Sequence, residues 1–112
     1  MRNRASGGRV TGRGRGCEGP YPAPSFVYLL ACLTPRGVLT YVGWTLDPDR
    51  RLDAHNSGKG AKSTRGRVWV IIHLERLETR REAMRREWHL KRDRKLRKQL
   101  ADAWLSQIRA TA

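Results

Sequence analysis

Two short apolar runs around a tight-turn signal constrain the fold of this chain more than any other feature. Residues 25–33 and 38–45 are rich in leucine, β-branched and aromatic side chains, and Thr34-Pro35-Arg36-Gly37 lies between them. Proline and glycine at these positions favour a tight turn. The segment therefore predicts a β-hairpin.

Downstream of the hairpin, the sequence predicts a short helix and then a basic loop. Asp47 is a good N-cap residue and Pro48 suits the first helical position, so a helix is expected to run to about Asn56. Residues 57–67 contain several glycines, lysines and arginines but no acidic residue. This composition predicts a flexible, strongly basic loop.

The second half of the chain predicts one more strand and two helices. Residues 68–77 form a third apolar and β-branched run. Thr79 opens a polar stretch with helical spacing, and Asp93 is placed to cap a final amphipathic helix with apolar residues Leu96, Leu100, Ala103, Trp104 and Ile108. The order β-β-α-β-α-α predicts an α+β fold, in which helices flank a small three-stranded sheet that is mixed or antiparallel.

Charge points to the kind of partner. The sequence has 24 lysines and arginines against 10 aspartates and glutamates, a formal net charge of +14. A surplus of this size indicates a polyanionic partner rather than a particular topology. Residues 1–24 are rich in Arg, Gly and Pro and lack any apolar period, so a disordered basic tail is expected there, ahead of one domain over residues 25–109. The tail either adds phosphate contacts or is dispensable.

Other sequence features bear on where the protein works. No apolar run reaches the roughly 20 residues that span a bilayer, and no hydrophobic stretch follows Arg2 and Arg4 as it does in a secretory signal. Cys17 and Cys32 are too few for a disulfide framework. We therefore expect no membrane contact, and a cytoplasmic location in association with the nucleoid.

Five pieces of sequence occur in an order that is specific when taken together. They are Phe26-Val27-Tyr28, Tyr41-Val42-Gly43, Arg51 followed one helical turn later by His55, the loop at 58–67, and the segment 81–92, which contains Glu87. In this order they resemble the GIY-YIG nuclease domain, and within that family the small single-domain bacterial proteins. The resemblance covers about residues 26–98. It implies the fold outlined above and an endonuclease activity.

The resemblance also implies a metal ion and a phosphate-binding arginine. One divalent ion, Mg²⁺ or Mn²⁺, is anchored by a single carboxylate in the family, and Glu87 matches that position. The alternative is that Glu87 only pairs with Lys91 at i+4. Arg51 is expected to hold the scissile phosphate, because a guanidinium stays charged and presents a fork of donors. Arg50 is turned about 100° from Arg51 on a helix, so only one of the two is expected to face the site.

Two tyrosines and a histidine are candidates for handling the proton of the attacking water. In the family, both tyrosines border the site. Tyr41 is expected to accept the proton or to orient the water, and Tyr28 to contact or orient the phosphate. His55 lies on the same helical face as Arg51 and is a rival base, because its ordinary pKa is near ~6.5. The sequence does not choose between Tyr41 and His55.

Several side chains are candidates for contact with the nucleic acid. Cations expected on its backbone are Lys59, Lys62, Arg65, Arg67 and Lys91. Trp44 stands where many relatives carry a lysine, and is expected beside the site, stacking on a base. Phe26 replaces the first glycine of the family motif and is expected to pack in the sheet. The other tryptophans are expected in the core or at an interface: Trp69, Trp88 and Trp104.

These features predict a metal-dependent endonuclease that cuts DNA and serves in DNA repair. Basic groups contact phosphates rather than bases, so the activity is expected to prefer a DNA structure or to be nonspecific. A targeting protein partner and the oligomeric state both stay open. The alternative is a non-catalytic nucleic-acid-binding protein that keeps the fold and the charge, and a third hypothesis is RNA as the ligand, bound with the help of the tail.

Overall fold

The structure is a computed structural model that describes residues 24–111. Its elements are β1 (Ser25–Thr34), β2 (Gly37–Thr45), α1 (Pro48–Asn56), the 3₁₀ turn η2 (Lys62–Thr64), β3 (Val70–Leu77), α2 (Arg80–Arg92) and α3 (Arg94–Thr111). The predicted α+β class and the order β-β-α-β-α-α are confirmed. Apart from Pro24, the tail predicted over residues 1–24 lies outside the described residues, so the domain division stays a prediction.

The three strands form an antiparallel sheet in the order β2-β1-β3. Pro35 and Arg36 make the turn of the predicted hairpin, and β1 pairs with β2 along its whole length, from Phe26 opposite Thr45 to Thr34 opposite Gly37. Strand β1 is therefore central and hydrogen-bonded on both sides. This position explains why its apolar side chains face two covered surfaces instead of alternating with polar ones.

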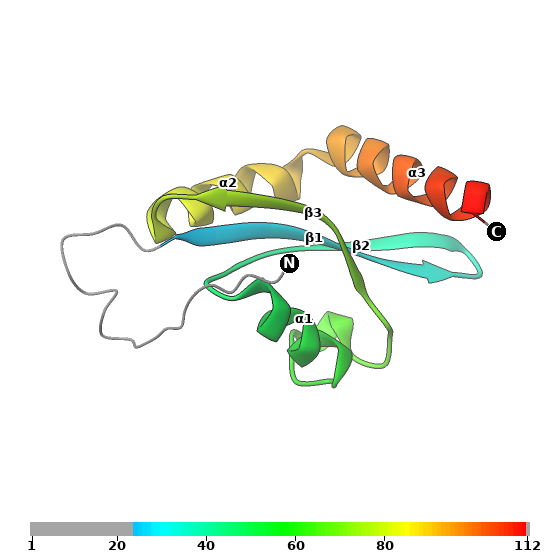
Figure 1. Ribbon diagram of the computed structural model, residues 1–112, viewed down its shortest axis with the longest axis horizontal. Coiled ribbons are helices and arrows are strands. Elements are labelled where there is room, and N and C mark those ends of the chain that lie inside the picture. Colours follow the sequence, from blue (N-terminus) through cyan, green and yellow to red (C-terminus); the bar gives the residue numbers. More distant parts are fainter. Residues whose placement is uncertain (1–23, 112) are drawn as a thin grey trace.

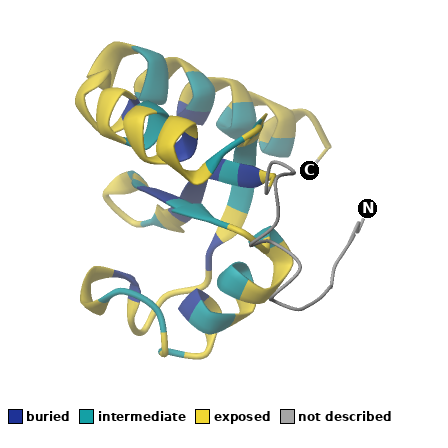
Figure 2. Ribbon diagram, turned by 90° about the vertical axis from the view of Figure 1, so that its left-hand side faces the viewer, coloured by how far each residue is buried: buried dark blue, intermediate teal, exposed yellow. Residues whose placement is uncertain are grey.

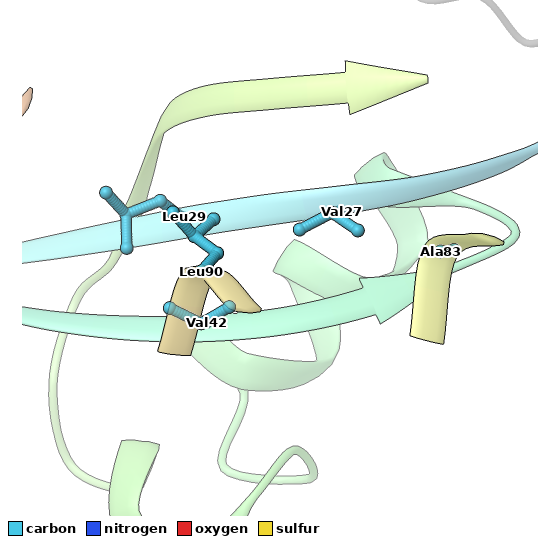
Figure 3. Packing of buried hydrophobic residues seen from close by; sticks show 5 residues of the cluster. All are labelled: Val27, Leu29, Val42, Ala83 and Leu90. Atoms are coloured by element: carbon cyan, nitrogen blue, oxygen red, sulfur yellow. The ribbon is translucent and has the colours of Figure 1, made fainter. Parts of the chain in front are cut away.

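Helices cover both faces of the sheet (Figure 1). Helices α2 and α3 lie over one face, and α1 lies with the loop that follows it on the other. On the α2 face, Val27, Leu29 and Val42 of the strands contact Ala83 and Leu90 of α2 (Figure 3). Partly buried residues complete this cluster: Trp44, Ile72, Leu77, Leu96 and Leu100.

The α1 face carries a separate cluster. Tyr28, Leu30, Cys32 and Trp69 are buried there, and three partly buried side chains pack against them, namely Tyr41, Leu52 and Ile71. Figure 2 shows the resulting layers, with buried residues on the sheet and on the inner turns of the helices and exposed residues on the outer turns. Polar aromatic groups therefore gather on the α1 face, while the buried cluster on the α2 face is apolar.

Strand β3 begins two residues later than predicted, at Val70 instead of residue 68. The backbone N–H of Trp69 donates to Asn56 Oδ1 at 2.7 Å, and its carbonyl accepts from Asn56 Nδ2 at 3.1 Å. Because these backbone groups are bonded to a side chain at the end of α1, they cannot join the ladder with β1. The contact ties the end of the loop to the end of α1.

The helix boundaries follow local capping chemistry. Asp47 Oδ1 accepts from the Arg50 N–H at the start of α1, and the predicted end at Asn56 is confirmed. Thr79 caps α2, and Asp93 Oδ1 accepts from the Leu96 N–H at the start of α3, as predicted. Within residues 24–111, no helix combines the length and apolarity needed to cross a bilayer.

Removal of the Leu90 side chain tests the packing of α2 on the sheet. Leu90 is fully buried against β1 and β2, so Leu90→Ala is expected to lower the free energy of unfolding by about 2–5 kcal/mol. Leu74→Ala is the matched control, because Leu74 is 48% exposed, and its cost should be about 1 kcal/mol or less. Chemical denaturation of both variants measures the difference, and equal costs would contradict the packing described.

Candidate active site

Tyr28 and Tyr41 lie on the α1 face of the sheet, on neighbouring strands. Tyr28 is paired with Gly43 and Tyr41 with Leu30, so the two tyrosines are diagonal neighbours. Their ring centroids are 6.4 Å apart. His55 of α1 completes the group, with its ring centroid 5.8 Å from that of Tyr28 and 5.0 Å from that of Tyr41. Three side chains that are distant in the sequence are thus brought together.

Gly43 creates the space that Tyr28 occupies. A Cβ at position 43 would collide with the hydroxyl and ring of Tyr28, because the ring lies across the backbone of its paired residue. Any larger side chain at this position would displace the ring. The glycine of Tyr41-Val42-Gly43 therefore has a packing role in the site itself.

His55 is fully buried, and both of its ring nitrogens have hydrogen-bond partners. The Tyr28 hydroxyl lies 2.9 Å from Nε2, and Thr64 Oγ1 lies 2.8 Å from Nδ1. Thr64 Oγ1 also donates to the Ala61 carbonyl at 2.8 Å. Buried polar atoms that lack a partner cost about 1–3 kcal/mol each. The series of hydrogen bonds Tyr28–His55–Thr64–Ala61 meets that requirement and connects the sheet to the basic loop.

Burial and charge shift the pKa values of this pair in opposite directions. Burial raises the pKa of Tyr28 above its ordinary value of 10.0; Arg51 beside its hydroxyl lowers it, while Tyr41 and Glu87 raise it. Burial lowers the pKa of His55 below 6.5, and the positive charge of Arg51 lowers it further. Both side chains are therefore neutral near pH 7, and one guanidinium acts on both.

Arg51 also borders a pocket of about 220 Å³ at the junction of β2 and α1. The pocket is lined by Thr45, Asp47, Arg50, Arg51 and Ala54. Arg50 and Arg51 both line this pocket. Arg51 is the one whose charge acts on both Tyr28 and His55.

Glu87 lies on the side of α2 that faces the sheet, one turn after Ala83 and one turn before Leu90. Its negative charge acts on Tyr28. Its carboxylate is 3.6 Å from Lys91 Nζ, so the predicted alternative pair at i+4 is formed. The Lys91 side chain is 54% exposed, and an exposed pair contributes at most about 1 kcal/mol. Such a pair does not stop the carboxylate from binding a metal ion.

The carboxylate of Glu87 is the kind of ligand that a hard divalent cation takes. Mg²⁺ commonly binds through one or two carboxylates and keeps several waters, and Mn²⁺ accepts the same oxygen ligands. Glu87 supplies one carboxylate close enough to Tyr28 to act on it electrostatically. In the part of the chain that the structure describes, no group of three or more His, Cys, Asp and Glu side chains forms a closed metal cage.

The basic loop has an outer and an inner set of residues. Its cations are all exposed, as contact with a nucleic acid requires: Lys59, Lys62, Arg65 and Arg67. Thr64 instead is fully buried, and a Cβ at Gly60 would collide with the His55 ring. Sequence reasoning missed Gly60 and Thr64, because loop residues have no period to reveal burial. The one available signal is that a buried histidine needs a hydrogen-bond partner for its second ring nitrogen.

The tryptophans lie in different environments. Trp44 packs with the α2-face cluster, whereas Tyr28 and Tyr41 lie on the α1 face. The expected stacking of Trp44 on a base stays a prediction. Trp69 is buried in the core, as expected. Trp88 is 53% exposed and is therefore no core residue; the guanidinium of Arg92 stacks on it at 3.8 Å from the ring centroid.

Comparison with known proteins agrees with this geometry. Residues 24–99 match the GIY-YIG catalytic domain. The chain belongs to the GIY-YIG family. This places it among nuclease domains, which act on nucleic acids and generally use divalent metals. The chain is 42% identical to UPF0213 protein CPE1444 of Clostridium perfringens over 69 residues, which is 61% of this chain and 71% of the relative.

Other relatives extend this similarity to archaea. UPF0213 protein SAG0778 of Streptococcus agalactiae is 46% identical over 65 residues, covering 57% of this chain and 70% of the relative. A UPF0213 protein of the archaeon Haloquadratum walsbyi is 40% identical over 79 residues, covering 69% of this chain and 85% of the relative. These names state no activity. No solved structure matches the chain.

The buried state of His55 predicts a pH dependence of stability. Its folded pKa is below 6.5, so in the interval between the folded and unfolded pKa values the unfolded chain binds a proton that the folded chain does not. The free energy of unfolding is therefore expected to fall as the pH drops below about 6.5. His55→Gln should reduce this slope, although it lowers stability at pH 7.

Denaturation measured at intervals between pH 7.5 and 5 checks this expectation. His89→Gln is the matched control, because His89 is exposed on α2, and it should leave the slope as in the wild type. An unchanged slope in His55→Gln would contradict the burial of a neutral imidazole.

Proposed function

We propose that this protein is an endonuclease that hydrolyses phosphodiester bonds in DNA with the help of a divalent metal ion. The observation that carries the proposal is the 2.9 Å contact between the Tyr28 hydroxyl and His55 Nε2, in a group that also includes Arg51. His55 Nε2 is an acceptor for the phenolic proton, and Arg51 places a positive charge beside the Tyr28 hydroxyl. Membership of a nuclease family supports the same reaction class.

Tyr28 takes the proton of the attacking water in this proposal. Its own hydroxyl proton passes to His55 Nε2, and the phenolate oxygen accepts a proton from water, so that hydroxide attacks phosphorus while His55 becomes an imidazolium. His55 Nε2 is already bonded to the Tyr28 hydroxyl, so in this proposal it acts through Tyr28 and not on water directly. The proposal thus gives Tyr28 the role that the sequence gave to Tyr41.

The energetics of this proton transfer are acceptable for an enzyme. Ordinary pKa values of 10.0 and 6.5 make transfer from a phenol to an imidazole unfavourable by about 5 kcal/mol. The opposite shifts of Tyr28 and His55 add to this cost. A reaction that turns over once per second has a barrier of about 17 kcal/mol, which leaves room for such a step. Arg51 stabilises the phenolate and disfavours the imidazolium, so its two effects on this transfer oppose each other.

Arg51 has a second role on the phosphate. The pocket beside it brings its guanidinium to a surface that a phosphate can reach, and a bidentate fork suits the non-bridging oxygens. Glu87 would hold the divalent ion, which when bound supplies positive charge to the phosphate and to the leaving oxygen. Tyr41 is partly exposed next to His55 and is suited to orienting the water or the phosphate.

The exposed cations of the basic loop bind the DNA backbone in this proposal. Lys91 adds a cation on α2, with its Nζ 3.6 Å from the Glu87 carboxylate. Phosphate contacts carry no sequence information, so cleavage depends on the structure of the DNA or is nonspecific.

Loss of Glu87 or Arg51 is expected to abolish catalysis without unfolding the protein. Glu87→Gln and Arg51→Ala should each lower the single-turnover nicking rate in Mg²⁺ by about 10²-fold or more, since each removes a charge that acts on the transition state. Lys98→Ala is the control, because Lys98 lies on the exposed side of α3 in a pair with Asp102. A panel of single-stranded, flapped, branched and duplex DNA provides the substrates.

The panel also separates the rival hypotheses. Wild-type protein that binds DNA tightly but cleaves none of these substrates in Mg²⁺ or Mn²⁺ would support a non-catalytic binding protein. Cleavage of the matching RNA substrates in preference to DNA would instead change the substrate and leave the chemistry in place.

Loop cations are expected to contribute affinity that weakens as the salt concentration rises. Lys62→Ala and Arg65→Ala should each weaken DNA binding and reduce the slope of log K against log[salt] by about 1, since each removes one phosphate contact. Fluorescence anisotropy at several salt concentrations measures this, with Lys98→Ala as the control. A slope unchanged by both substitutions would remove the loop from the binding surface.

A further inference from the structure

Thr64 is the one hydroxyl-bearing residue of the basic loop that is wholly buried among residues 57–67, and all its polar atoms are engaged. Its N–H donates to the Ala61 carbonyl at 3.0 Å, and its carbonyl accepts from Trp69 Nε1 at 2.9 Å. Its hydroxyl contacts both the Ala61 carbonyl and His55 Nδ1, at 2.8 Å each. A residue held at every polar atom is fixed in one rotamer.

The direction of the hydrogen bonds follows from what each atom is able to do. A carbonyl oxygen only accepts, so the single hydroxyl proton of Thr64 goes to Ala61. Thr64 Oγ1 then has only lone pairs to offer to His55, and Nδ1 must carry a hydrogen. Since a neutral imidazole has one N–H, Nε2 is left as an acceptor, and the Tyr28 hydroxyl donates to it.

The other tautomer would reverse the contact with Tyr28. With the hydrogen on Nε2, His55 would donate to the phenolic oxygen, and no base would be present to receive the phenolic proton. The Nδ1 lone pair would then face the lone pairs of Thr64 Oγ1 at 2.8 Å. If the hydroxyl turned to donate to Nδ1 instead, its lone pairs would face those of the Ala61 carbonyl, also at 2.8 Å. The Thr64 hydroxyl therefore decides which nitrogen of His55 faces Tyr28 as a base.

Neighbouring residues hold Thr64 and His55 in fixed positions relative to each other. The loop backbone at Gly60 lies against the imidazole, where a Cβ would collide with Nδ1. Trp69, which holds the Thr64 carbonyl, is itself held by the side chain of Asn56 at the end of α1. The loop that carries the exposed cations is thus closed over His55 by contacts that do not involve DNA.

We propose that Thr64 is a positioning residue that fixes His55 in the tautomer protonated at Nδ1, and so keeps Nε2 free to accept the proton of Tyr28. This role rests on the proposed function for its effect on cleavage, but the tautomer itself does not depend on any activity. Groups that orient a metal-ligating histidine typically affect activity by about 10–100-fold, and we expect an effect of the same size for Thr64.

Two substitutions separate the hydroxyl from the shape of the side chain. Thr64→Val keeps the size and branching but removes the hydroxyl, whereas Thr64→Ser keeps the hydroxyl and removes a methyl group. Nitrogen-15 NMR of the histidine rings reports the tautomer of His55 in the full chain. We expect a protonated Nδ1 and an unprotonated Nε2 in wild type and in Thr64→Ser, and a mixed or reversed tautomer in Thr64→Val.

Single-turnover cleavage supplies the second readout. Thr64→Val should cut about 10–100-fold more slowly with unchanged DNA affinity, and Thr64→Ser should recover most of the loss. Wild-type protein with the hydrogen of His55 on Nε2 would overturn the proposal even if Thr64→Val did not fold. So would a Thr64→Val protein that keeps the wild-type tautomer. A wild type that cleaves no substrate, but shows the expected tautomers, would overturn the nuclease function and leave the role of Thr64 standing.

Discussion

The rest of this structure depends on the burial of one histidine, His55. Removing an imidazole from water requires a partner for each ring nitrogen, since an unsatisfied buried nitrogen costs more than the hydrogen bond it would make. His55 obtains one partner from the central strand, Tyr28, and one from the loop, Thr64. Close approach of both partners needs glycines at positions 43 and 60. One side chain thus ties the sheet, α1 and the basic loop together.

One face of the sheet carries the main apolar core, and the other carries the candidate site residues Tyr28, Tyr41 and His55. On one face, α2 and α3 bury an apolar cluster that holds Leu29 and Leu90 away from water. On the other, α1 brings Arg51 and His55 over the tyrosines, where burial shifts pKa values instead of only excluding water. Strand β1 contributes to both faces because it is central and paired on both sides over residues 26–31. Glu87 belongs by position to the apolar side, and its charge nevertheless acts on Tyr28.

Much of the fold was predictable because its signals are local. The turn at Pro35 and the caps at Asp47 and Asp93 depend on neighbouring residues only, and they lie where predicted. The start of β3 was missed because a long-range contact between Asn56 and Trp69 takes the backbone groups that a strand needs.

The site was predictable in part. Its tyrosines, arginine, histidine and glutamate followed from an ordered family pattern. That Trp44 and Tyr41 lie on different faces was predictable, since strand residues three apart point to opposite faces. The direction of the hydrogen bonds at His55 was not predictable, because Thr64 reaches the ring only through the folded loop.

Replacement of each tyrosine by phenylalanine tests the central claim most directly, because the ring stays and only the hydroxyl is lost. Single-turnover cleavage of DNA in Mg²⁺ should fall by about 10²-fold or more in Tyr28→Phe, while DNA affinity stays as in the wild type. Tyr41→Phe should lose less. A Tyr28→Phe protein that cleaves as fast as the wild type, or faster than Tyr41→Phe, would contradict the assignment of Tyr28 and His55 as the pair that activates water.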